Sequence, residues 1–332
     1  MEQDHFINFE YGKKQVKQTR LIRQIVVGAC AVFFLLIYYF FITAPHSFVS
    51  NTVVSIEENT VLAKVSDSLK KQGVIRSTVV FEFLMILHGG EKKIVPGDYF
   101  FESAVPVYVV ANRILAHDFG MPQTKVVLPE GLTREQMADI LARNLPKFNK
   151  DEFLNFTATA EGYLFPDTYF FFPTVTTSAV AKKLYDTFDQ KTEELQKQAR
   201  MQGKNFKEVV ILASIVEKEA AGDADRKIIA GILQNRLEKG MRLQADATVG
   251  YVIHKGREEI KASDLKIDSP YNTYLYKGLP PAPISNPGLQ ALEAVLSPEN
   301  TAYFYYIHDK TGTAHYAKTF EEHKKNIATY LK

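Results

Sequence analysis

The clearest hydrophobic pattern in the chain is a single apolar run near its N-terminus. Residues 25–44 (IVVGACAVFFLLIYYFFITA) carry no charge, and about 20 such residues are enough for a helix to cross a bilayer core. Five basic residues lie shortly before the run, and no Lys or Arg follows it before Lys64. By the positive-inside rule, this asymmetry predicts a single-pass anchor with residues 1–24 in the cytoplasm and the rest of the chain outside it.

A cleaved signal peptide is the alternative interpretation of this run. The run is long for the apolar part of a signal peptide, and Ala44-Pro45-His46 is a poor small-residue cleavage site. We therefore expect an uncleaved anchor. Cys30, the one cysteine of the chain, lies inside the run. A single cysteine excludes an intrachain disulfide framework and a Cys-rich zinc site.

The spacing of apolar residues after the anchor predicts a compact module over residues 46–120. Its expected elements are a strand, two helices, a second strand and a further helix, at residues 53–56, 61–72, from Ser77 to the Gly89-Gly90 pair, 94–101 and 106–116. A strand–helix–helix–strand unit of this size resembles the LysM-like module, a small carbohydrate-binding fold. A generic α+β spacer domain has the same pattern, and a fold does not fix a function.

The pattern over residues 121–332 predicts a second domain with a mixed α+β fold. Capping signatures at Thr133 and Asn149 begin two helices, and residues 177–200 form a long helix with a polar face. A hairpin with its turn near Thr311-Gly312 precedes the last helix. We therefore expect an α+β fold in two parts after the anchor.

The stretch Ile211–Ala220 is the strongest candidate for chemistry. It begins as an almost unbroken apolar run and ends in Glu217-Lys218-Glu219. A helix this apolar is buried nearly all round, so a carboxyl group at its end can be partly desolvated and can hold a proton near neutral pH. The plainer alternative is the solvated end of a core helix. Glu217 and Glu219 each continue an apolar face of the predicted helix, so the spacing of apolar residues does not show which of them is the functional carboxylate.

Composition narrows the possible functions. The 40 Lys+Arg and 38 Asp+Glu give a net charge of +2, so no basic excess points to nucleic acid. The histidines lack the spacing of a zinc helix, and the chain has no Gly-rich phosphate loop, so we expect neither a metal nor a cofactor. What remains is a carboxylate at the end of a buried helix, with aromatic and polar loops that can form a groove. A glycan-cleaving site needs such a carboxylic acid, because a glycosidic oxygen leaves poorly unless it is protonated.

Several motifs in order closely resemble the MltG/YceG-like endolytic murein transglycosylases, and the resemblance covers nearly the whole chain. These motifs are Glu161–Tyr169, Ser214–Glu219, Asn235–Leu237, Gly240–Gln244, Asp246, Thr248-Val249, Tyr271–Tyr274 and Gly278–Pro281. The chain departs from the pattern in having no Trp, where relatives often carry one in the aromatic loop; Tyr163, Phe165 and Tyr169 stand there instead.

The resemblance implies non-hydrolytic cleavage of the β-1,4 bond between N-acetylmuramic acid and N-acetylglucosamine in nascent glycan strands, which leaves 1,6-anhydro ends and terminates strand elongation. The catalytic acid and then base of the family corresponds to Glu219, with Glu217 as the alternative or a supporting group. The candidates for contact with substrate are Arg242, Gln244, Asp246, Thr248, Tyr271, Asn272 and Tyr163, for each of which a structural role is also open.

By the same resemblance, residues 46–120 are a LysM-like module and residues 121–332 are a YceG-like catalytic domain. The expected location is the cell (inner) membrane, with the catalytic domain periplasmic or otherwise extracytoplasmic. The expected partners are peptidoglycan strands and, in addition, enzymes of wall synthesis. A non-catalytic wall-binding scaffold and a glycan hydrolase are the two rival interpretations.

Overall fold

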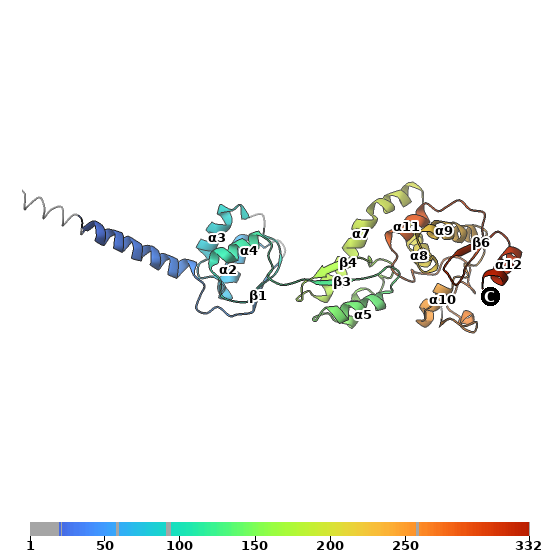
Figure 1. The fold of residues 1–332 in the computed structure, drawn as a ribbon, viewed down its shortest axis with the longest axis horizontal. Helices are drawn as coiled ribbons and strands as arrows, with labels where there is room; N and C mark the ends of the chain where they lie inside the picture. Colours follow the sequence, from blue (N-terminus) through green and yellow to red (C-terminus); the bar gives the residue numbers. More distant parts are fainter. Residues whose placement is uncertain (1–19, 21, 58–59, 91–93, 257–258, 332) are drawn as a thin grey trace, which may run out of the picture. The chain divides into compact units, whose positions relative to one another are not determined.

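The computed structural model describes residues 20, 22–57, 60–90, 94–256 and 259–331. The chain divides into two compact units, Met1–Pro122 and Gln123–Lys332 (Figure 1). The division falls in the loop where the sequence predicts a change of domain. The predicted domains, residues 46–120 and 121–332, stay a prediction.

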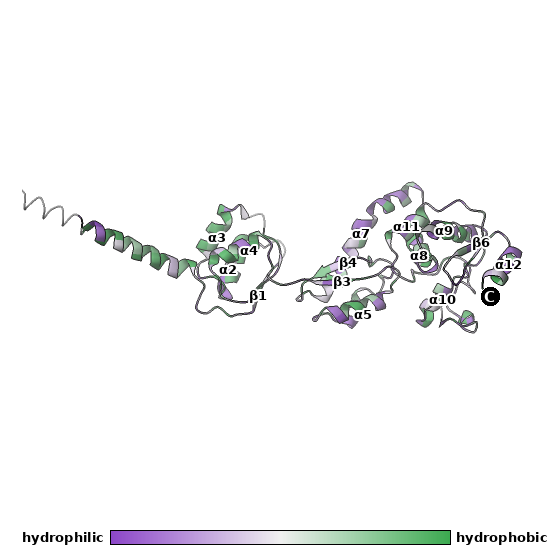
Figure 2. Ribbon diagram, in the orientation of Figure 1, coloured by the Kyte–Doolittle hydropathy of each residue, from purple (hydrophilic) through white to green (hydrophobic). Residues whose placement is uncertain are grey.

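The first unit contains one helix that is long and apolar enough to cross a membrane, among the residues described. It covers Ile22–Ile42, 21 residues whose apolar window is not buried against the protein. Its last five residues, Tyr38–Ile42, form a π-helical segment, η1. The helical form of the predicted anchor is thereby confirmed, and its apolar surface runs along its length (Figure 2).

A small α+β module completes the first unit. Its elements are β1 (Thr52–Ile56), α2 (Leu62–Lys71), α3 (Thr78–Leu87), β2 (Gly97–Phe101) and α4 (Val107–Leu115). β1 and β2 pair antiparallel, with Thr52 opposite Phe101 and Ile56 opposite Gly97. The helices bury one face against this pair, around Phe81, Met85 and other side chains of the module core. The predicted order of elements is confirmed, while the LysM-like identity of the module stays a prediction.

The second unit is larger and mostly helical. Its elements are β3 (Thr124–Val127), α5 (Arg134–Asn144), α6 (Lys150–Phe156), β4 (Thr168–Phe171), α7 (Thr177–Met201), α8 (Phe206–Glu219), α9 (Asp223–Glu238), α10 (Asp246–Ile253), η4 (Asp264–Lys266), α11 (Leu289–Leu296), β5 (Tyr305–His308), β6 (Ala314–Ala317) and α12 (Phe320–Tyr330). β3 pairs antiparallel with β4, and β5 with β6. The caps predicted at Thr133 and Asn149 are both present, and Thr319 forms a further capping box at the start of α12.

Two hydrophobic cores lie within this unit. One gathers β3, α5, α6, β4 and the first half of α7 around residues such as Leu141 and Phe153. The other surrounds α8, whose residues Val209–Val216 are all buried. α7, α9, α10 and α11 all contact α8. The pattern predicts neither α10 nor α11, because each has only eight residues and α10 contains β-branched residues and a glycine, which favour helix weakly.

Candidate active site

The apolar run of α8 ends at a buried carboxylate. Glu219 is the last residue of the helix, and only 3% of its surface is exposed. The helix stops there because Ala220 adopts an extended conformation. The expectation that an ionisable group would lie at the edge of the core is confirmed.

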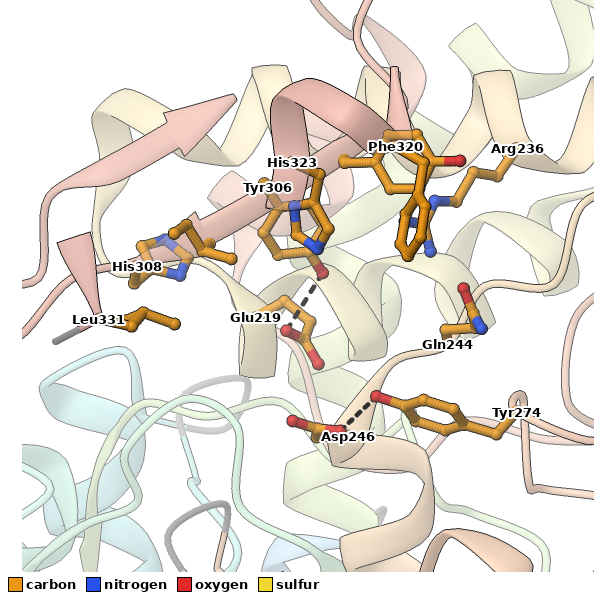
Figure 3. Close-up of a pocket in the computed structure, with 12 residues that line it drawn as sticks. Glu219, Arg236, Gln244, Asp246, Tyr274, Tyr306, His308, Phe320, His323 and Leu331 are labelled. Carbon is orange, nitrogen blue, oxygen red and sulfur yellow. Dashed lines mark hydrogen bonds between the residues drawn. The ribbon is translucent and has the colours of Figure 1, made fainter. Parts of the chain in front are cut away.

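Glu219 faces a cavity of about 400 Å³ at this end of α8 (Figure 3). The walls come from α9, the start of α10, the loop after η4, the β5–β6 hairpin and α12. The lining residues are Glu219, Arg236, Gln244, Asp246, Tyr274, Tyr305, Tyr306, Ile307, His308, Phe320, His323 and Leu331. A cavity of this size is within the usual range for a small-ligand site.

Two groups from distant parts of the chain hold the Glu219 carboxylate. The Tyr306 hydroxyl of β5 donates to Oε2 at 3.1 Å. The backbone N–H of Ala247, in the first turn of α10, lies 3.4 Å from Oε1. Each carboxylate oxygen therefore has a partner on the protein, while the cavity leaves room for a ligand beside the carboxyl group.

A second carboxylate, Asp246, lies on another wall of the cavity. The Tyr274 hydroxyl donates to its Oδ1 at 2.6 Å (Figure 3). Burial raises the pKa of Tyr274 well above its ordinary value, and the hydrogen bond to Asp246 and the charges of Asp246 and Glu219 raise it further. Tyr274 therefore stays protonated at neutral pH and acts as a hydrogen-bond donor.

A buried cation completes the electrostatics of the cavity. Arg236 of α9 is 6% exposed, and its Nε and Nη1 donate to the carbonyl oxygens of Phe304 and Leu243, both at 2.6 Å. Burial lowers the pKa of Arg236, while the nearby tyrosines and Glu219 act in the opposite direction. Because arginine remains charged in proteins, Arg236 places a fixed positive charge near both carboxylates.

Glu217 has a different environment, although it is only two residues from Glu219. Its Oε1 accepts a hydrogen bond from Arg226 Nη2 at 3.1 Å, and its Oε2 accepts one from the N–H of Gly288 at 3.0 Å. Glu130 lies 3.7 Å from the same arginine. Glu217 does not line the cavity. It joins α8 to α9 and to the residue that precedes α11.

The turn after Glu219 is fixed by Asp225, near the start of α9. Its carboxylate accepts from the N–H groups of Ala221 and Gly222, both at 3.2 Å. His308 Nε2 lies 2.8 Å from the same carboxylate. One side chain therefore ties the end of α8 to the strand that carries Tyr306.

Only part of the predicted substrate-binding set lines this cavity. Gln244 and Asp246 do, and Arg242 lies close by in sequence, exposed, with Nε donating to the carbonyl of Leu275 at 3.1 Å. Thr248 is fully buried and bonded to Thr273 at 2.9 Å. Asn272 is buried, and its amide donates to two backbone carbonyls.

The two predicted tyrosines also lie among protein side chains. Tyr271 packs against Tyr251 with ring centroids 5.2 Å apart, and Tyr163 packs edge-on against Phe188 at 5.2 Å. Neither is among the cavity residues. The substrate-contact roles of the whole set stay predictions.

Sequence reasoning missed most of the cavity wall. Tyr274 belongs to a motif quoted for the resemblance, but we did not assign it a role. Tyr306 and His308 lie in the predicted hairpin, and strand alternation places them on one face. Strand alternation could therefore predict that the two side chains share a face, but it could not predict that this face lies against the end of α8.

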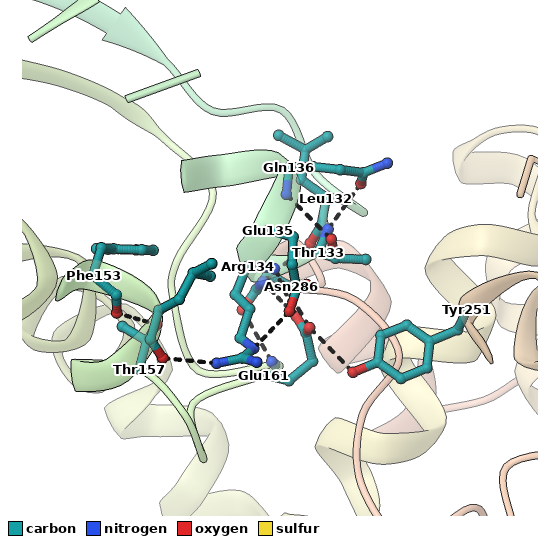
Figure 4. Close-up of polar contacts among 12 residues, drawn as sticks. Leu132, Thr133, Arg134, Glu135, Gln136, Phe153, Thr157, Glu161, Tyr251 and Asn286 are labelled. Carbon is teal, nitrogen blue, oxygen red and sulfur yellow. Dashed lines mark hydrogen bonds and ion pairs between the residues drawn. The ribbon is translucent and has the colours of Figure 1, made fainter. Parts of the chain in front are cut away.

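A further buried carboxylate, Glu161, lies between the two cores of the second unit (Figure 4). Asn286 Nδ2 donates to its Oε1 at 2.9 Å, and the N–H of Arg134 lies 3.2 Å from the same atom. The Tyr251 hydroxyl lies 3.4 Å from Oε2. Burial, with a smaller effect of the Glu135 charge, raises the pKa of Glu161 from 4.5 to about 7.

No group of three or more His, Cys, Asp or Glu residues is placed to hold a metal ion within the part of the chain that the structure describes. His308 and His315 each pair with an aspartate instead, Asp225 and Asp309.

Comparison with known proteins assigns the chain to a family. A model of the YceG-like family matches residues 54–329. The chain is 28% identical to an endolytic murein transglycosylase of Bacillus subtilis over 305 residues, covering 84% of each protein. It is 26% identical to an endolytic murein transglycosylase of Streptococcus pneumoniae, with 84% of this chain covered but 58% of that protein.

A solved structure extends the likeness to three dimensions. The crystal structure of a yceG-like protein from Listeria monocytogenes shares 31% identity and aligns with a TM-score of 0.58, over 83% of this chain and 99% of the other. The resemblance inferred from the motifs is confirmed. The chain belongs to the YceG-like family.

Proposed function

We propose that this protein is an endolytic lytic transglycosylase that cuts the glycan strands of peptidoglycan. The observation that carries the proposal is the geometry of Glu219, a carboxylate 3% exposed, held by a tyrosine hydroxyl and open to a cavity. The family membership and the printed names of the relatives from Bacillus and Streptococcus support the same reaction class.

In the proposed reaction Glu219 acts first as an acid. It gives its proton to the glycosidic oxygen, and the bond between that oxygen and C1 of N-acetylmuramic acid breaks as N-acetylglucosamine leaves. The muramoyl 6-hydroxyl then attacks C1 and gives its proton to the Glu219 carboxylate. No water is consumed, and the product carries a 1,6-anhydro ring. One carboxyl group serves both steps, in contrast to the paired carboxylates of most glycosidases.

The surrounding residues have supporting roles in this proposal. Tyr306 fixes the orientation of the Glu219 carboxylate through its hydrogen bond. The Arg236 charge stabilises the Glu219 carboxylate that the first step leaves, because an opposite charge nearby favours the ionised form. Asp246, held by Tyr274, is placed to offset positive charge that develops at C1.

The aromatic residues of the wall suit a sugar substrate. Tyr305 and Phe320 line the cavity beside the polar groups, with ring centroids 5.9 Å apart. The charge of the cavity is mixed, with Glu219 and Asp246 near Arg236.

The proposed place of action is the outer face of the cell (inner) membrane. The apolar helix Ile22–Ile42 anchors the chain, and the basic residues before it keep residues 1–24 in the cytoplasm. Residues 46–120 act as a LysM-like module, and residues 121–332 are the catalytic domain. The nearest partners are nascent glycan strands and the enzymes that polymerise them.

The test is digestion of purified peptidoglycan by the full-length chain in detergent, run in heavy-oxygen water. We expect products with anhydro-muramoyl ends and no heavy oxygen, and we expect them to disappear in Glu219→Gln. Glu217→Gln is the matched control, because it lies on the same helix but outside the cavity. Reducing ends that contain heavy oxygen would identify a hydrolase instead. Glycan binding without any product would identify a scaffold.

A further inference from the structure

Helix α3 of the first unit has apolar side chains on both its buried and its exposed face. Phe81 and Met85 are fully buried in the module core. On the other side of the helix, Phe83 is 61% and Leu87 is 65% exposed. A helix that is hydrophobic all round is usually covered on all sides, and the module covers only one face of α3.

The exposed apolar residues of α3 form one continuous stripe. Val79, Phe83, Ile86 and Leu87 are exposed, and the spacing i, i+4, i+7, i+8 places them on one helix face. The one ionisable residue of α3, Glu82, accepts a hydrogen bond from Ser66 of α2, so it does not interrupt the stripe. Figure 2 shows the hydrophobic character of α3.

Few other large apolar side chains of this unit are exposed. Outside the helix Ile22–Ile42, the described residues of the first unit include seven such side chains, and four of them are the α3 stripe. Scattered exposed apolar residues are ordinary, whereas a contiguous patch marks an interaction surface.

The start of α3 is tied directly to the end of the apolar helix. Arg76 lies two residues before α3, and its Nε and Nη2 donate to the carbonyl of Ala44 at 3.0 and 2.8 Å. Its guanidinium also lies 5.3 Å from the ring centroid of Tyr39. Ile42 and Phe48 pack against the module core. The module is therefore held at the point where the apolar helix ends.

The lengths agree with a shared bilayer. The 21 residues of the apolar helix extend about 31 Å, which matches the hydrocarbon core. Its last residues thus lie at the level of the headgroups. α3 has ten residues and spans about 15 Å, so a helix that begins beside Ala44 lies entirely within about that distance of the headgroup level.

We propose that the outer face of α3, made of Val79, Phe83, Ile86 and Leu87, lies in the interfacial layer of the same bilayer that holds the apolar helix. The proposal rests on the anchoring proposed above and extends it. Apolar helix faces of this kind sink into the boundary between headgroups and acyl chains. The module then has two attachments to the membrane, a spanning helix and an interfacial one, which together fix its orientation.

The experiment uses the full-length chain with one polarity-sensitive fluorophore, in vesicles of phosphatidylethanolamine and phosphatidylglycerol. The natural chain offers Cys30 as its single labelling site, inside the apolar helix. Three further proteins carry Cys30→Ala together with Phe83→Cys, Leu87→Cys or, as an exposed polar control on α2, Lys64→Cys. Lipids with nitroxide-labelled acyl chains are the quencher.

We expect quenching at positions 83 and 87 of the same order as at Cys30, and severalfold greater than at position 64. Equal, weak quenching at 83, 87 and 64 together with strong quenching at Cys30 would overturn the α3 proposal while the anchor stands. Weak quenching at Cys30 itself would overturn both the anchor and the α3 contact.

A second copy of the chain is the other possible cover for α3. In that case the probe at position 83 reports an apolar environment without lipid quenching, and the signal returns to that of water when the protein is diluted with excess vesicles. This outcome would also overturn the proposal. Because glycan digestion is measured separately, none of these outcomes depends on the catalytic assignment.

Discussion

Glu161 and Glu219 are buried carboxylates of the second unit that differ in what surrounds them. Glu161 lies between the two cores, enclosed by Asn286, the N–H of Arg134 and Tyr251. Glu219 is equally buried, at 3% exposed against 6%, but its carboxyl group borders a cavity. Burial is therefore common to both carboxylates, and access for a ligand is the difference on which the proposed catalytic role of Glu219 rests.

The role of Glu161 follows from its partner Asn286, which is fully buried. The Asn286 Oδ1 accepts from the N–H groups of Gly162 and Leu164 at 3.0 and 2.9 Å. Its Nδ2 donates to the carbonyl of Leu132 and to Glu161. This amide uses all of its hydrogen-bonding capacity to join segments of both cores, and Glu161 completes the junction.

The largest expected effect separates the two carboxylates by activity. Glu219→Gln removes the proposed proton donor, and general acid–base catalysis contributes roughly 10²–10⁴-fold, so we expect the rate of anhydro-product formation to fall by that factor. Glu161→Gln should retain a rate within a few fold of the parent, measured under conditions where both variants are folded. The opposite pattern would reverse the two assignments.

The second prediction concerns stability and pH at Glu161. Its pKa rises on folding from 4.5 to about 7, so the folded state binds the proton more tightly than the unfolded state. The resulting stabilisation is complete below pH 4.5 and is lost as pH rises to about 7, a change of about 3 kcal/mol.

Glu161→Gln lacks this titration, since an amide stays neutral. We expect the unfolding free energy of the parent to fall relative to the variant by about 3 kcal/mol between pH 4.5 and pH 7. Denaturant titrations of both proteins across this range measure the difference. A difference that does not change with pH would show that folding does not shift the pKa of Glu161.

The third prediction uses Glu217 to sharpen the contrast. Glu217→Gln weakens the bonds to Arg226 and to the N–H of Gly288, and a hydrogen bond to a charged group contributes about 2 kcal/mol. We expect a loss of stability of that size in urea unfolding, with little change in the rate per folded molecule. Full stability combined with lost activity would instead place Glu217 in the chemistry.

The smallest effect is expected at Tyr306. Tyr306→Phe removes the donor to Glu219 Oε2, and we expect the rate to fall about tenfold, equivalent to about 1.4 kcal/mol. Loss of a donor favours the protonated carboxyl, so the alkaline limb of the pH–rate profile should move to higher pH. Tyr303→Phe is the control, because Tyr303 stacks on Tyr316 outside the cavity. An unchanged pH profile in Tyr306→Phe would show that Tyr306 does not position the Glu219 carboxylate.

Local signals in the sequence predicted most of the fold. Ser77, Thr133 and Asn149 each cap the helix that they were expected to begin, because capping depends on residues only three positions apart. The buried run of α8 was predictable for the same reason, since its apolar character is continuous.

The site was less predictable because its contacts are distant in sequence. Tyr306 lies 87 positions from Glu219. The groups that donate hydrogen bonds to Glu217 belong to α9 and to the segment before α11. Thr248 and Asn272 have the polar side chains of a binding motif, yet their atoms bond to the protein itself. The periodicity of apolar residues describes one helix or strand at a time, so it does not predict which helix and strand faces contact each other.

The position of Tyr306, Phe320 and Leu331 in the cavity wall has a consequence for biosynthesis. Chains are made and folded from the N-terminus, so Glu219 and the helices around it emerge before the hairpin and α12. A chain that has reached only α11 carries the acid but lacks its tyrosine partner and much of the wall. The cavity wall is thus completed only after the hairpin and α12 have been made, which delays the proposed cutting activity until these elements have joined α8.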